Sequence, residues 1–345
     1  MKKYYKISLF FIIFFVVLIV LGCLIYKYNV SPVSSDDTFV SFKVESGSSF
    51  LTIAEFFYKL YVKLHHVNGL EAGTYYVSSN MSVKELVTTL SGKSINEDVM
   101  TITFKEGLHM RKIAKTIADA TEYTEDDVMK VVADTQFLNT LISEYWFLTD
   151  DILDSDIYYP LEGYLFPDTY EFVKDVHIED IFRRLLDGME SALTPYREEI
   201  ESSEYSIHEI LTLASIVELE AAGSNDRAGV AGVFYNRLAS GWSLGSDVTT
   251  YYAIKVDMNE RDLSKAELND YNAYNTRCSK MAGKLPVGPI CNPGLDAIVA
   301  VIEPTTHDYF YFVADKNKKT YFNKTSNGHT NTIAELKSAG LWYEY

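Results

Sequence analysis

The chain has 345 residues, 47% of them hydrophobic, so it is long enough for two or three compact units with sizeable cores. Its formal net charge of −17 excludes a nucleic-acid partner, because phosphate binding requires clustered Lys and Arg. Three cysteines are too few for a disulfide framework, and we favour separate thiols for Cys278 and Cys291. The seven histidines are scattered, so we predict no metal centre and no cofactor.

An uncharged run at residues 7–26, ISLFFIIFFVVLIVLGCLIY, is long enough to cross a bilayer as a helix. Lysines precede it and acidic residues follow it, so the positive-inside rule predicts a cytoplasmic N-terminus and an extracellular or periplasmic remainder. A cleaved signal peptide is an alternative, although no A-x-A-like site follows; a lipoprotein box around Cys23 is another. We expect a single-pass protein of the cell membrane. Residues 1–27 would form a short cytoplasmic N-terminus and the transmembrane helix, and residues 28–37 a polar linker.

Short units of strand then helix are expected between residues 38 and 120, which is typical of a small α+β domain. The first strands are predicted at 38–44 and 72–77, with a helix near 45–62 after the first and a capped helix that stops near Gly92 after the second. Beyond them, residues 124–148 are predicted as one helix and residues 150–160 as an acidic loop. The stretch at 160–172 is rich in Gly, Pro and Tyr, which suits a packed turn at the start of a second domain. Further helices are expected at 181–193, 227–239 and about 331–338, a strand at 307–315, and a rigid loop at 284–294.

One helix carries a carboxylate where an apolar residue is expected. Ser206 and Glu209 form the pattern of a capping box, which predicts a helix start at residue 206. Counted from there, Glu218 shares one helix face with three apolar residues, Ile207, Leu211 and Ala214. A carboxylate in that place must be paired, solvated by a cleft, or kept protonated by desolvation. The sequence therefore marks Glu218 as the first candidate for a functional residue.

Several long motifs occur in a fixed order along the chain. They are EGYLFPDTY (162–170), LASIVELE (213–220), RAGVAGVFYNRL (227–238), AYNT (273–276), LPVGPICNPG (285–294) and YFVAD (311–315). With these motifs the chain resembles the YceG-like endolytic murein transglycosylase (MltG) family from about residue 38 to its end. The resemblance implies an α+β protein with a single N-terminal transmembrane helix, a LysM-like α+β domain with a connecting region (38–157), and a mixed α/β YceG-like catalytic domain (158–345).

The resemblance implies a lyase that cuts peptidoglycan glycan strands, with Glu218 as its catalytic glutamate. Glu218 would protonate the oxygen of the MurNAc–GlcNAc β-1,4 bond, and the sugar's own C6 hydroxyl would then attack C1. The product would end in 1,6-anhydroMurNAc, which would terminate glycan elongation. One carboxylate suffices because a tethered hydroxyl replaces water. The structural alternative is a glutamate bonded to buried backbone or to an arginine such as Arg227 or Arg237.

Four other residues are candidates for substrate binding. Glu220 matches the family but lies on a different helical face, so we interpret it as a pocket or structural residue. Asp247 aligns with an acidic loop position and could steady positive charge at C1, or simply cap a helix or turn. Tyr274 and Asn275 offer a stacking face and an amide for an N-acetyl sugar; ordinary loop packing is the alternative.

Departures from the family pattern concern the same region. Gly245 stands where the family usually has Gln, Val248 and Val287 where it has Pro, and Thr320 where a His is common. The expected partners are peptidoglycan strands, the membrane, and cell-wall synthases with the elongation machinery. Two alternative functions stay open. One is a non-catalytic or weakly active peptidoglycan-binding scaffold, and the other is a hydrolytic muramidase that uses Glu218 with Asp247.

Overall fold

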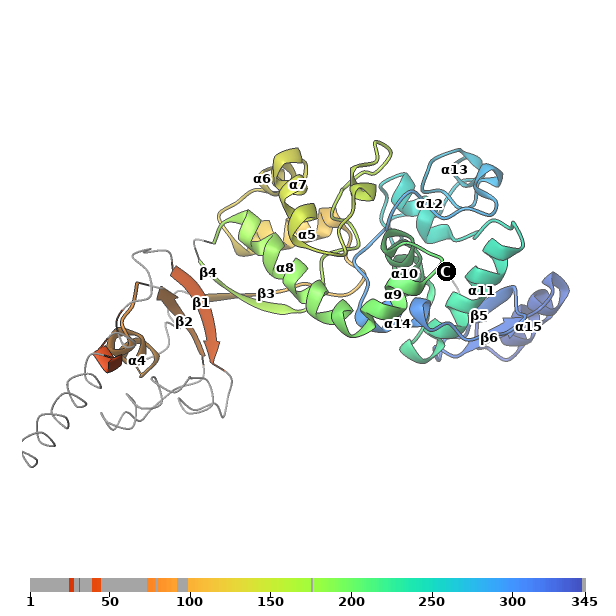
Figure 1. Cartoon of the computed structure of the whole chain (residues 1–345). Helices are drawn as coiled ribbons and strands as arrows, with labels where there is room; N and C mark the ends of the chain where they lie inside the picture. Colours follow the sequence, from red (N-terminus) through yellow and green to blue (C-terminus); the bar gives the residue numbers. More distant parts are fainter. Residues whose placement is uncertain are drawn as a thin grey trace, which may run out of the picture. The chain divides into compact units, whose positions relative to one another are not determined.

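The computed structural model describes residues 25–27, 31, 39–44, 73–78, 80–91, 99–174 and 176–342 (Figure 1). The chain divides into two compact units, Met1–Val99 and Met100–Tyr345. Most of the predicted transmembrane segment, 7–26, and most of the predicted linker lie outside the described residues. Within the described part, no helix is long and apolar enough to cross a membrane.

The first unit contains an antiparallel strand pair and one described helix. Strand β1 (Phe39–Val44) pairs with β2 (Gly73–Ser78), with Phe39 opposite Ser78 and Val44 opposite Gly73. Helix α4 (Val83–Ser91) follows β2, and its apolar residues at i, i+4 and i+7, Val83, Val87 and Leu90, are buried. These elements confirm the predicted strands near 38–44 and 72–77 and the capped helix after them. The helix predicted near 45–62 lies outside the described residues.

The second unit is mainly helical with two small sheets. Strands β3 (Val99–Thr103) and β4 (Thr169–Val173) pair with each other, and β5 (Tyr311–Ala314) pairs antiparallel with β6 (Thr320–Asn323). The helices are α5 (Met110–Ala120), α6 (Glu125–Val132), α7 (Thr135–Glu144), α8 (Ile178–Leu193), α9 (Arg197–Ser202), α10 (Ile207–Glu220), α11 (Arg227–Ala239), α12 (Asp247–Ala253), α13 (Lys265–Asn269), α14 (Leu295–Ile302) and α15 (Ser326–Ser338).

One predicted helix differs from the structure. The helix predicted over 124–148 is two helices, because the Asp134 side chain accepts from the backbone N–H groups of Gln136 and Phe137 and starts α7. The predicted boundary between a LysM-like and connecting region (38–157) and a catalytic domain (158–345) stays a prediction. Residues 100–157 pack in the second unit. Their buried side chains, such as Met110 and Leu141, belong to the same hydrophobic core as α10 and α14.

Helix α10 is the central element of this core. Apart from the capping residue Glu209, which is exposed, every residue from Ile207 to Val217 is buried, and the helix packs against α11, α12 and α14 (Figure 1). The predicted capping box is confirmed, since Ser206 accepts from the Glu209 N–H and Glu209 accepts from the Ser206 N–H. The last turn of this rigid helix carries Glu218 and Glu220. Cys278 and Cys291 are both buried and free, as predicted.

Candidate active site at the end of helix α10

Glu218 takes part in a largely buried ion pair. Its Oε1 accepts from Nη2 of Arg227 at 2.6 Å, and its Oε2 accepts from the Gly294 N–H at 3.1 Å. The Glu218 side chain is 7% exposed and the Arg227 side chain is 11% exposed. Burial raises the pKa of the Glu218 carboxyl above its usual value, although Arg227 and the Gly294 amide act in the opposite direction. Thus the arginine pairing that sequence reasoning held as the structural alternative is present, and the carboxyl still has an elevated pKa.

Two more carboxylates surround the same guanidinium. Glu106, in the turn between β3 and α5, lies 3.6 Å from Nη2 of Arg227, and Asp296, in the first turn of α14, lies 3.6 Å from Nη1. Their side chains are 51% and 68% exposed, so they lie between the buried pair and solvent. Sequence reasoning did not select either residue. Nothing in their local pattern distinguishes them from ordinary surface carboxylates.

A buried polar network fixes the backbone beside Glu218. The Glu162 carboxyl is 1% exposed and accepts from the Met110 N–H, the Tyr252 hydroxyl and Nδ2 of Asn292. Burial raises the pKa of Glu162 to about 8. Sequence reasoning noted Glu162 only as the first letter of a motif. A glutamate followed by Gly, Tyr and Leu gives no local sign of burial.

Asn292 joins three separate segments through this network. Its Oδ1 accepts from the N–H groups of Gly163 and Leu165, and its Nδ2 also donates to the Leu108 carbonyl. Its backbone carbonyl accepts from the Gly107 N–H at 2.9 Å. Asn292 is two residues before Gly294, whose N–H reaches Glu218. The network therefore holds both the Gly294 donor and the turn that carries Glu106.

The loop that contains the Gly294 donor is also tied directly to α10. The Ile290 N–H donates to Oγ of Ser215 at 3.0 Å, and the Cys291 thiol lies 3.3 Å from the Ser215 carbonyl. Ser215 is fully buried and lies one turn before Glu218 on the helix. A serine inside an apolar helix thus serves to register the predicted rigid loop, 284–294, against the candidate catalytic residue.

Glu220 and Asp247 lie at a neighbouring point on the helix end. Oε1 of Glu220 accepts from Oγ of Ser246 at 2.6 Å, and burial raises the pKa of the Glu220 carboxyl. Asp247 follows Ser246 as the first residue of α12; its side chain is 59% exposed and lies 3.2 Å from Nε of Arg277. The pairing of Glu220 with Ser246 connects α10 to the loop before α12. Asp247 remains accessible to a ligand.

Tyr274 and Asn275 are buried, which favours the packing alternative for both. Tyr274 is fully buried among Tyr158 and Tyr252, at ring-centroid distances of 4.8 and 4.9 Å, and its hydroxyl accepts from the Tyr158 N–H. The Asn275 side chain is 1% exposed and bonds to Thr250 and to backbone carbonyls of the α13 region. Neither side chain presents a face to solvent, so their proposed sugar contacts stay a prediction that the geometry does not favour.

Known proteins resemble this chain over most of its length. The YceG-like family model matches residues 46–335. The chain belongs to the YceG-like family. A relative from Bacillus subtilis, named endolytic murein transglycosylase, is 35% identical over 327 residues, which is 90% of this chain and 89% of the relative. A Streptococcus pneumoniae protein of the same name is 33% identical over 302 residues, or 82% of this chain, but this chain covers only 54% of it.

A crystal structure supports the same assignment. A YceG-like protein from Listeria monocytogenes superposes with a TM-score of 0.63 at 31% identity, covering 86% of this chain and all of that one. The mixed α/β YceG-like architecture predicted for the catalytic region is therefore confirmed.

The departures from the YceG-like sequence pattern have local structural reasons at two positions. Gly245 has φ of +65°, its N–H donates to the Thr276 carbonyl, and its own carbonyl accepts from Arg277. A side chain at that φ is strained, so the loop takes glycine here. Val287 uses its N–H to donate to the Ala273 carbonyl at 3.1 Å, a bond that proline cannot make. Val248 is buried, and nothing in the structure explains its replacement of proline.

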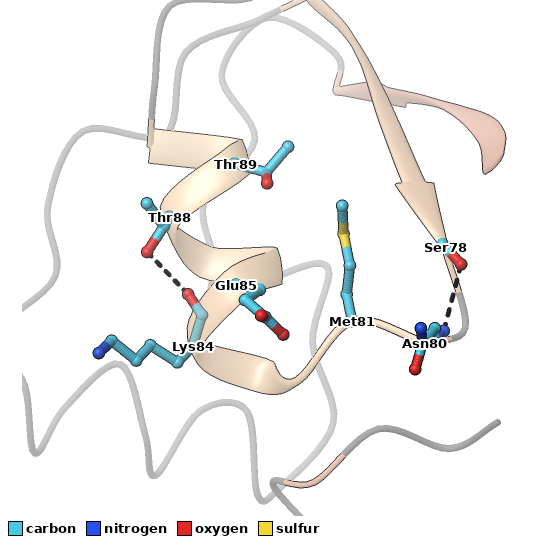
Figure 2. Close-up of a pocket in the computed structure, with 7 residues that line it drawn as sticks. All are labelled: Ser78, Asn80, Met81, Lys84, Glu85, Thr88 and Thr89. Atoms are coloured by element: carbon cyan, nitrogen blue, oxygen red, sulfur yellow. Dashed lines mark hydrogen bonds between the residues drawn. The ribbon is translucent and has the colours of Figure 1, made fainter. Parts of the chain in front are cut away.

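A separate cavity of about 540 Å³ lies in the first unit. Side chains of α4 and the end of β2 line it, and Figure 2 shows Lys84 and Thr88 on the helix with Met81 and Asn80 on the connecting turn. Ser78, Glu85 and Thr89 complete the lining. The residues that line it are polar apart from Met81, and they include one cation and one anion. It shares no residue with the Glu218 site.

Proposed function

We propose that this chain is an endolytic lytic transglycosylase that cleaves the MurNAc–GlcNAc β-1,4 bond within peptidoglycan strands and leaves a 1,6-anhydroMurNAc end. The observation that carries the proposal is the buried Glu218 carboxyl with its elevated pKa, at the glutamate of the family motif. Relatives named endolytic murein transglycosylase over most of this chain add support.

In the proposed reaction, Glu218 acts first as acid and then as base. Its proton passes to the glycosidic oxygen as the bond from C1 of MurNAc to that oxygen breaks. The C6 hydroxyl oxygen of the same sugar then bonds to C1, and its proton returns to Glu218. No water is consumed and the carboxyl ends in its starting form. Arg227, at 2.6 Å, stabilises the ionised carboxylate between the two transfers.

We further propose that residues 7–26 anchor the chain in the membrane with the second unit on the extracellular or periplasmic side. The uncharged run and its flanking lysines support this topology. The first unit is proposed to be LysM-like, since β1 and β2 pair antiparallel across an intervening segment of 28 residues and α4 follows. Cell-wall synthases and elongation proteins are the proposed partners, because a glycan-cutting enzyme on the membrane would meet strands as they are made.

The test is digestion of purified glycan strands by wild-type protein and by E218Q, with the new ends identified by mass. The expected result is anhydro ends from the wild type and none from E218Q. The matched control is E209Q, on the same helix, because glutamine at that position keeps the capping box. Ends heavier by one water would support a muramidase that uses Asp247. Strands that bind but keep their length distribution would support the scaffold.

A further inference from the structure

Arg227 is one cation among three carboxylates. Glu218 contacts it at 2.6 Å, and Glu106 and Asp296 at 3.6 Å each. With all three carboxyls ionised, the three carboxylates and the largely buried Arg227 together carry a net charge of −2. Such an arrangement favours a proton on one carboxyl.

Exposure decides which carboxyl takes that proton. Glu106 and Asp296 are more than half exposed, so water solvates their charges, whereas the Glu218 side chain is 7% exposed. Glu106 and Asp296 also raise the pKa of Glu218 by repulsion, in addition to the larger effect of its burial. When Glu218 is protonated, the two exposed carboxylates still balance the Arg227 charge.

A glycine brings Glu106 into this arrangement. A Cβ atom on residue 294 would lie 2.1 Å from Oε1 of Glu106, so the Glu106 side chain passes over the bare backbone of Gly294. The same Gly294 donates its N–H to Glu218. The neighbouring Gly107 N–H is bonded to the Asn292 carbonyl, which fixes the turn that carries Glu106. The contact between Glu106 and Arg227 therefore depends on a backbone close approach and not on a chance surface rotamer.

We propose that Glu106 is a positioning residue: it competes with Glu218 for Arg227 and so keeps Glu218 in the protonated form that can give a proton to a glycosidic oxygen. This inference rests on the proposed function for its catalytic consequence. The charged groups that face Glu218 are Arg227 from α11, Asp296 from α14 and Glu106 from the turn before α5. The Cys291 thiol also faces it, and burial holds the pKa of that thiol well above its usual value, so it stays neutral.

The test compares wild type with E106Q by two readouts. In E106Q, only Glu218 and Asp296 remain as carboxylate partners of Arg227. The ionised form of Glu218 is therefore stabilised, and the pKa of its carboxyl falls. The alkaline limb of the pH–rate profile should then move to lower pH, with about a tenfold loss of rate on that limb for each unit moved. The rate in the acidic plateau should be retained. The variant E106D keeps the charge and should restore most of the wild-type profile.

The second readout needs no catalysis. Carbon-13 NMR of protein labelled at the glutamate carboxyl carbons follows the titration of Glu218, which is identified by its loss in E218Q. The titration should shift to lower pH in E106Q, and also in G294A, which displaces Glu106 by sterics while keeping both charges and the Gly294 N–H. The control is D119N, which removes an exposed carboxylate paired with Lys115 on α5.

The two readouts separate the inference from the proposed function. If wild-type protein forms no anhydro ends, the proposed function fails while the NMR titration still tests the role of Glu106. An unchanged Glu218 titration in E106Q and G294A overturns the inference, whatever the activity. A uniform loss of rate at every pH, with the titration unchanged, would mean that Glu106 contributes only to structure or substrate contact.

Discussion

The buried Glu162 carboxyl should make the stability of the second unit depend on pH. Burial raises its pKa from 4.5 to about 8. The folded state therefore holds the proton more tightly than the unfolded chain between these values. The contribution of Glu162 to stability is greatest below about pH 4.5, falls as the pH rises through the interval, and levels off above about pH 8. The difference between the two pKa values corresponds to a loss of about 5 kcal/mol, which is large beside a typical domain stability of 5–15 kcal/mol.

The variant E162Q removes the titration without removing the side chain. Glutamine stays neutral at every pH, and its oxygen can still accept from the Met110 N–H. Its NH₂ group meets donors from Asn292 and Tyr252, so we expect a constant loss of about 1–3 kcal/mol. In E162Q the pH-dependent part of the free energy of unfolding should disappear. Wild type should therefore be the more stable protein at pH 5, and this advantage should narrow or reverse as the pH rises to 9.

Urea unfolding followed by tryptophan fluorescence measures this difference. All three tryptophans, Trp146, Trp242 and Trp342, lie in the second unit, so the signal reports the unit that contains Glu162. Other titrating groups affect both proteins equally and cancel in the comparison. Parallel pH profiles for wild type and E162Q would refute the reasoning, because they would mean that Glu162 is ionised in the folded state over this range, as it is in the unfolded chain.

Two further predictions concern backbone space and thiol access. Gly163 has φ of +86°, and a Cβ atom there would lie 2.3 Å from the Pro289 ring, so G163A should lower the free energy of unfolding in urea by about 2–5 kcal/mol. Gly241 has φ of +69° with open space around it, so G241A should lower it by only about 1–2 kcal/mol. Equal losses in the two variants would contradict the steric argument. Burial raises the pKa of the Cys291 thiol well above its usual value, and Cys278 is buried too. A thiol reagent should therefore label two more cysteines per chain in urea than in the folded protein, and fast labelling of both in the folded state would contradict this.

Local patterns predicted the parts of the site that depend on a single helix. The capping box at Ser206 and Glu209 and the apolar spacing after it are enough to place Glu218 on a buried face. These signals act within one or two turns, where sequence distance and spatial distance agree. The same reasoning could name Arg227 as one partner of a buried glutamate, but it could not choose between partnership and catalysis.

Long-range contacts were beyond this kind of reasoning. Glu106 reaches Arg227 from more than one hundred residues away, and Asn292 bonds to Gly163 across a similar distance. Neither contact has a periodic or compositional signal. The aromatic residue Tyr274 shows the opposite error, since its residue type suggests a sugar platform whereas packing against Tyr158 and Tyr252 buries it completely.

A single carboxyl that first gives a proton and then takes one back must be stable enough in both its protonated and its ionised form. Burial by itself would hold Glu218 protonated and make it a poor base, while an arginine by itself would hold it ionised and make it a poor acid. The site combines the two influences on one side chain, with Arg227 at 2.6 Å and a side-chain exposure of 7%. A reaction that returns the proton to its donor needs this balance more than it needs a second carboxylate, so an arginine beside the candidate acid is compatible with transglycosylase chemistry.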